Sequence, residues 1–222
     1  MRSRLVLLAC GVVSPLLYLT GDMVASIRYD DYSYLHQTIS ELNAIGSPTR
    51  GLTIGFGIAV YLALIAFSLG LWTSTERSRR LRLVASLLFA LGVVSLWAVP
   101  FASMRTRGAQ QGPAHIIEGA VAVTLILASI GIGATCFGRR FRRYSIATML
   151  VLLAFGVWAG IDGPRIALGM STPWVGVKER ISVYSYQLWF VALAVTLLRR
   201  PVQPRASQQA QGADGASPQR WQ

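Results

Sequence analysis

Six long apolar segments constrain the fold of this chain more than any other feature. They span residues 5–25, 52–72, 83–103, 115–137, 145–168 and 179–198. An α-helix needs about 20 apolar residues to cross roughly 30 Å of hydrocarbon, and each segment is long enough. Because a bilayer offers no water to backbone polar groups, a helix must satisfy them within the segment. The sequence therefore predicts an all-α polytopic membrane protein with six transmembrane helices in one bundle.

The charge content agrees with this class. Only 14% of the 222 residues are charged, whereas a soluble domain carries about a quarter. The net charge of +12 would suggest a nucleic-acid partner for a soluble protein. Here the basic residues cluster in short loops between apolar segments, so we expect no nucleic acid as partner. Residues 1–200 form the predicted membrane domain. Residues 201–222, rich in Pro, Gln, Ala, Ser and Gly, form a predicted disordered tail.

The arginines predict an orientation. One side of the predicted bundle carries 14 of the 21 basic residues, namely Arg2, Arg4, Arg77, Arg79, Arg80, Arg82, Arg139, Arg140, Arg142, Arg143, Arg199, Arg200, Arg205 and Arg220. Short loops rich in Lys and Arg remain cytoplasmic. We therefore expect a bacterial inner-membrane protein with both termini in the cytoplasm, where anionic lipid headgroups would be its partners. The first segment is long and lacks a clear cleavage site, which favours a retained helix over a secretory signal.

Ten polar residues near the opposite, outer ends of the segments form the candidate site. Ionisable groups at membrane depth cost about 2.5–3.5 kcal/mol each unless they are paired or hydrated. One interpretation is that they make salt bridges and helix caps at the interface. The other is that they converge beneath the loop 32–51 in a polar pocket whose histidines titrate near neutral pH. The ten are Asp22, His36, Ser40, Glu41, His115, Glu118, Asp162, Arg165, Glu179 and Arg180.

Local signals refine this picture. Thr38 followed three residues later by Glu41 is typical of a capping box and predicts a short helix in the first outer loop. Arg180, Tyr184 and Gln187 fall on one helical stripe. Small residues mark close helix contacts in membranes; those predicted here are Gly51, Gly55, Gly131 and Gly133.

No motif assigns a reaction. The chain lacks a Gly-x-Ser-x-Gly elbow, a Gly-rich phosphate loop and cysteines at metal spacing, so we predict no metal site and no cofactor and assign no catalytic residue. The favoured hypothesis is a protein that binds a lipid headgroup or small polar molecule in the outer pocket. One alternative is a membrane hydrolase or transferase with His115 as general base, oriented by a carboxylate. A transporter is the other, although the inner helix halves carry almost no ionisable residues.

The segment ISELNAIGSP at residues 39–48 resembles the hallmark of bacterial family 998 of the domains of unknown function. His115 and the run Glu179-Arg180-Ile181 also match its pattern. The layout is similar to that of six-helix proteins of the Frag1/DRAM type. Family members often carry an Asp shortly after a Pro at the end of the third helix, but no acid follows Pro100 closely here. The resemblance implies a six-helix membrane fold and no particular reaction.

Overall fold

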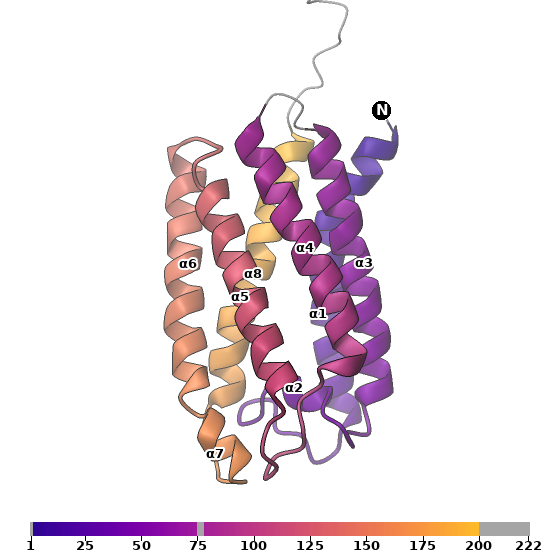
Figure 1. Cartoon of the computed structure of the whole chain (residues 1–222), viewed down its shortest axis with the longest axis vertical. Coiled ribbons are helices and arrows are strands. Elements are labelled where there is room, and N and C mark those ends of the chain that lie inside the picture. Colours follow the sequence, from indigo (N-terminus) through magenta and orange to yellow (C-terminus); the bar gives the residue numbers. More distant parts are fainter. Residues whose placement is uncertain (1, 75–77, 200–222) are drawn as a thin grey trace, which may run out of the picture.

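The structure is a computed structural model that describes residues 2–74 and 78–199, and within them it is helical without any strand (Figure 1). Six helices are long and apolar enough to cross a membrane. They are α1 (Arg2–Arg28), α3 (Arg50–Ser74), α4 (Arg79–Phe101), α5 (Pro113–Gly133), α6 (Arg139–Gly160) and α8 (Val175–Leu198). Two short helices, α2 (Ile39–Leu42) and α7 (Gly163–Ala167), lie between them. The predicted all-α fold with six spans is confirmed. The predicted disordered tail lies outside the described residues.

The six long helices form a closed ring. Each contacts the next along the chain, and α8 returns to pack against α1. Among the six neighbouring pairs of helices in this ring, α5 and α6 contact each other least. Helix α1 begins and helix α8 ends at the same end of the bundle, and the short helices α2 and α7 lie at the opposite end (Figure 1). We call these the arginine end and the α2 end. The arginines predict that the arginine end faces the cytoplasm.

Local sequence explains where helices begin and end. Thr38 Oγ1 accepts from the Glu41 N–H at 3.3 Å, and the Glu41 carboxylate accepts from the Thr38 N–H at 2.7 Å. This confirms the predicted capping box at α2. The expected apolar segment 145–168 is interrupted, because α6 ends at Gly160 and α7 begins only at Gly163. Pro164 cannot donate the backbone hydrogen bond that a continuous helix would need there.

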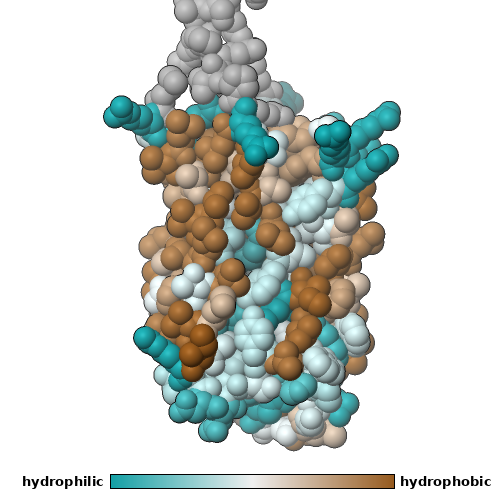
Figure 2. Space-filling view, turned by 180° about the vertical axis from the view of Figure 1, so that it is seen from behind, coloured by the Kyte–Doolittle hydropathy of each residue, from teal (hydrophilic) through white to brown (hydrophobic). Residues whose placement is uncertain are grey.

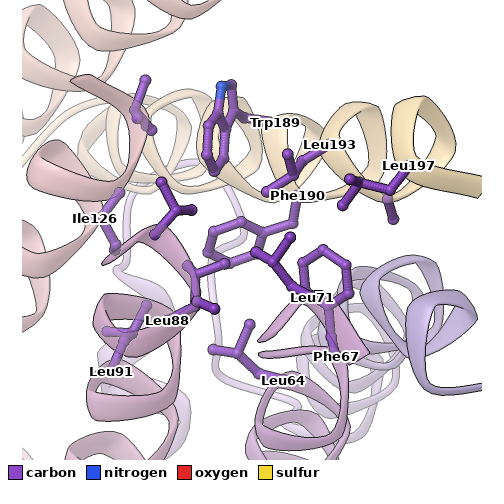
Figure 3. Packing of buried hydrophobic residues seen from close by; sticks show 14 of the residues in the cluster. Leu64, Phe67, Leu71, Leu88, Leu91, Ile126, Trp189, Phe190, Leu193 and Leu197 are labelled. Atoms are coloured by element: carbon purple, nitrogen blue, oxygen red, sulfur yellow. The ribbon is translucent and has the colours of Figure 1, made fainter. Parts of the chain in front are cut away.

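The apolar core occupies the half of the bundle near the arginine end. Leu64, Phe67 and Leu71 of α3, Leu88 and Leu91 of α4, and Phe190, Leu193 and Leu197 of α8 point into one interior (Figure 3). Trp189 is fully buried, and its indole N–H donates to Ser145 Oγ at 2.9 Å. A buried indole normally finds such a partner. These side chains bury one another, and some of them, such as Leu64 and Phe190, also form the floor of the cavity described below.

Glycines allow the helices to approach closely at some of the predicted positions. A Cβ on Gly133 would stand 2.6 Å from Cζ2 of Trp189, so this contact requires glycine. Gly51 and Gly55 have nothing within 4 Å of such a Cβ, so the prediction of close contacts there is wrong. Both lie on the surface of α3 or at its start, where an added methyl would meet no other part of the described chain.

The outside of the bundle is apolar between two polar ends. In Figure 2, brown, hydrophobic side chains lie on either side of a pale strip that runs down the face, and teal, hydrophilic ones gather at both ends. Trp97, Phe101 and Leu150 are each more than 60% exposed. Exposed apolar surface on this scale marks contact with a membrane or partner. Together with the six spans, it makes the chain a multi-pass membrane protein.

Gly133→Ala should destabilise the fold by about 1–3 kcal/mol, because the new methyl forces the fully buried Trp189 out of its packing. The free energy of unfolding, measured by SDS titration in mixed micelles, checks this. Gly55→Ala is the matched control and should not lower it, because Ala in an exposed helix interior is about 0.5–1 kcal/mol more favourable than Gly. Equal stability of the two variants would contradict the packing described here.

Candidate functional site

A buried ion pair joins α1 to α8 near the α2 end. Arg180 donates from Nε to Asp22 Oδ2 at 2.9 Å and from Nη2 to Asp22 Oδ1 at 2.8 Å. Both residues are only 4% exposed. The Tyr184 hydroxyl also donates to Asp22, so the sequence stripe that contains Arg180 and Tyr184 does meet one carboxylate. Such bidentate, charge-assisted bonds fix geometry as well as contributing energy.

Arg180 also holds the first loop against the bundle. Its Nη1 donates to the Tyr34 carbonyl at 2.7 Å, and its guanidinium lies 3.6 Å from the Tyr34 ring centroid. Its Nη2 donates to the Tyr32 hydroxyl at 2.8 Å, which itself donates to the Thr38 carbonyl at 2.9 Å. Burial raises the pKa of the Tyr32 phenol, which keeps this hydroxyl available as a donor. A Cβ on Gly176 would lie 2.3 Å from the Gln37 carbonyl oxygen, so glycine lets this loop sit directly on α8.

A second ion pair ties three loops together. Arg107 donates to both carboxylate oxygens of Glu41, at 2.8 and 2.9 Å. It also donates to the Met170 carbonyl at 2.9 Å and to Thr172 Oγ1 at 3.0 Å. Exposed His36 accepts from the Trp174 N–H at 3.0 Å through Nδ1. The α2 end is thereby covered by an interlocked set of loops.

The third ion pair lies at the start of α7. Lys178 Nζ donates to Asp162 Oδ2 at 2.8 Å and stands 4.8 Å from the Trp158 ring centroid. Arg165 is exposed. Asp162, Arg165 and His36 do not line the cavities described next.

Beneath the first loop, the helices surround a cavity of about 800 Å³. Four of the candidate residues line it: Ser40, His115, Glu118 and Glu179. Glu179 accepts from Ser40 Oγ at 3.3 Å and from the Ile39 N–H. Glu118 accepts from Ser95 Oγ at 3.1 Å. A smaller cavity of about 180 Å³ shares several of these walls and includes Asp22.

His115 has a different orienting group from the one expected for a general base. Its Nδ1 lies 3.2 Å from the carbonyl oxygen of Ala102. The hydrolase hypothesis expected a carboxylate to orient this ring. The contact instead ties the start of α5 to the end of α4, which positions His115 in the cavity wall.

The wall of the larger cavity changes character along its length. On α5 the lining runs from His115 and Glu118 to Ala122 and Ile126, and on α8 it runs from Glu179 to Phe190. Both helices begin at the α2 end, so the acidic side chains of the wall lie there. Towards the middle of the bundle the wall is uncharged and largely apolar, with Ser14 and Gln187 among the apolar residues. The lining also includes Gly156, Ala159 and Gly160 of α6, the helix that has the fewest contacts with α5 among the neighbouring pairs of the ring.

Sequence reasoning missed several residues of this region. Arg107 and Lys178 were not among the candidates, although each is an ion-pair partner of one. Polar residues inside the helices were also missed, and they line the larger cavity: Ser14, Tyr18, Tyr61, Ser95, Ser182, Tyr186 and Gln187. The stripe of Arg180, Tyr184 and Gln187 was a usable signal for α8. Arg107 lies in a loop without periodicity, so no pattern marked it.

The family model described as Protein of unknown function (DUF998) matches residues 12–196, which covers all six long helices in whole or in part. The chain belongs to the DUF998 family. The resemblance carried by residues 39–48, His115 and residues 179–181 is thereby confirmed. No curated protein and no solved structure matches this DUF998 protein.

Asp22→Asn should destabilise this DUF998 protein by about 3–5 kcal/mol, because it leaves the buried Arg180 cation without its counter-charge. The free energy of unfolding in mixed micelles measures the effect. Arg165→Gln, at an exposed cation of the same end, should change it by less than about 0.5 kcal/mol. If Asp22→Asn were as stable as Arg165→Gln, the ion pair would not hold α1 and α8 together.

Proposed function

We propose that this multi-pass membrane protein binds an amphiphilic molecule, such as a membrane lipid, in the larger cavity beneath the first loop. The headgroup lies among Ser40, His115, Glu118 and Glu179, and the apolar chain extends towards Ile126. The observation that carries the proposal is the order of the cavity wall: its acidic side chains lie near the α2 end, and towards the bundle centre it is uncharged and largely apolar. A lipid of the same leaflet has its polar and apolar parts in that order along the membrane normal.

The size and access of the cavity support this function. Its volume of about 800 Å³ falls within the roughly 300–1,000 Å³ of typical ligand sites. Ile116 lines the cavity and is 61% exposed, so the wall reaches the surface of α5. Across from α5, α6 contributes Leu152 and the small residues Gly156, Ala159 and Gly160 to the wall. A lipid chain therefore has lateral access between α5 and α6.

The location completes the proposal. With the arginine end in the cytoplasm, the α2 end and its cavity lie in the outer half of a bacterial inner membrane. The arginines then contact anionic headgroups of the cytoplasmic leaflet. Buried apolar side chains such as Trp189, Leu193 and Leu197 occupy the other half of the bundle. That packing supports binding over transport, because transport needs a polar path through both halves.

Photolabelling tests the proposal. The full chain in lipid nanodiscs is irradiated with a twelve-carbon alcohol that carries a diazirine in its chain, and labelled residues are mapped by mass spectrometry. Labels should concentrate on the walls contributed by α5 and α6. Gly119→Phe should lower this labelling about fivefold, because Gly119 lines the cavity and an aromatic side chain occupies volume that the ligand needs.

Gly55→Phe is the matched control. Gly55 lies on the exposed side of α3 with nothing within 4 Å of an added Cβ, so this variant should keep the labelling of the parent chain. Labelling spread over all lipid-facing helix surfaces, and equal in both variants, would overturn the proposed function.

A further inference from the structure

We propose that the cavity selects a ligand whose headgroup carries an ammonium group. This inference rests on the proposed function and names the chemistry of the headgroup. It starts from the observation that some acidic residues at the α2 end have an ion-pair partner and others do not. Asp22, Glu41 and Asp162 each have an Arg or Lys partner at 2.8 Å. Within residues 2–74 and 78–199, Glu118 and Glu179 form no ion pair at all.

The two unpaired carboxylates face the same cavity. Their hydrogen-bond partners are neutral: Ser95 for Glu118, and Ser40 with the Ile39 N–H for Glu179. No Lys or Arg lines either cavity in the part of the chain that the structure describes. Carboxylates at membrane depth are costly without a counter-charge. A cationic ligand supplies that charge, whereas an anionic headgroup would be repelled.

Two buried polar atoms without partners point to a ligand independently. Ser14 Oγ and Gln187 Oε1 have no hydrogen bond to any described residue, and the two residues are 1% and 6% exposed. Both residues line the larger cavity. Buried polar atoms are nearly always hydrogen-bonded, so an orphaned one needs an explanation. An ammonium group brings three N–H donors and no acceptor, which suits the two carboxylates. Gln187 follows Glu179 by eight residues on α8, about 12 Å along the helix, so its amide oxygen faces a deeper part of the cavity.

Aromatic rings complete the match. Tyr18, Tyr61 and Tyr186 line the same cavity from α1, α3 and α8. A cation placed over such rings is attracted by their negative faces, and aromatic cages are a recurrent way of recognising ammonium ligands. Carboxylates together with tyrosine rings favour a cation over a neutral alcohol. They favour it still more over a carboxylate or phosphate headgroup.

Competition against the diazirine alcohol tests the inference on the full chain in nanodiscs at neutral pH. The competitors are dodecylamine, dodecanol and dodecanoate, which share a chain and differ in the head. Dodecylamine should compete about tenfold better than dodecanol, because hydrogen bonds to charged groups are stronger than neutral ones. Dodecanoate should compete worst. In Glu118→Gln/Glu179→Gln the preference for the amine should fall below about twofold, since a neutral amide offers no counter-charge.

Asp30→Asn/Asp31→Asn is the matched control, since it removes two exposed carboxylates from the same end. It should keep the amine preference; its loss there would show that surface charge alone attracts the amine, and would overturn the inference. Equal competition by dodecylamine and dodecanol on the unmodified chain would also overturn it, whether or not the glutamine variant folds, and would leave the proposed function standing. If ethylamine competed as well as dodecylamine, recognition of the ammonium group would be supported. The proposed function, binding of an amphiphilic molecule with an apolar chain, would then be overturned.

Discussion

The buried pair of Arg180 and Asp22 is the interaction on which the α2 end of this protein depends. Both charges are removed from water, so the pair is tolerable only because its geometry is bidentate and the remaining guanidinium donors are used. Those donors go to the Tyr34 carbonyl and the Tyr32 hydroxyl. One side chain therefore joins two helices and places the first loop over the bundle. The cavity exists beneath that loop because the loop is held there.

The bundle divides into two halves with different physical characters. Near the arginine end, leucines, Phe67 and Trp189 fill the interior and leave it solid. Near the α2 end, serines, tyrosines and acids replace them, and α5 and α6 pack only thinly. A bundle built this way has a recess near one end, with packed apolar side chains in the other half. This division supports the proposed binding function over transport, with the packed half acting as a scaffold for the recess.

Sequence patterns predicted the helices and their caps better than they predicted which charged residues form ion pairs. Length and apolarity predicted the six spans, and the spacing of Thr38 and Glu41 predicted the cap of α2, because these signals are local. His115 and Glu118 line one cavity because they are three residues apart on one helix. Glu41 pairs with Arg107, 66 residues away, and Asp162 pairs with Lys178. Tertiary packing decides such choices among several cations at the same end, and no local pattern records it. The exposed position of His36 follows from the path of the loop and has the same cause.

A cryo-electron microscopy structure of the full chain in lipid nanodiscs, with an antibody fragment added for alignment, tests the central claim most directly. The account predicts elongated density between α5, α6 and α8, with its head beside Glu118 and Glu179 and its tail reaching Ile126. Carboxylates turned towards bulk solvent or lipid, or a recess closed by packed side chains, would contradict it.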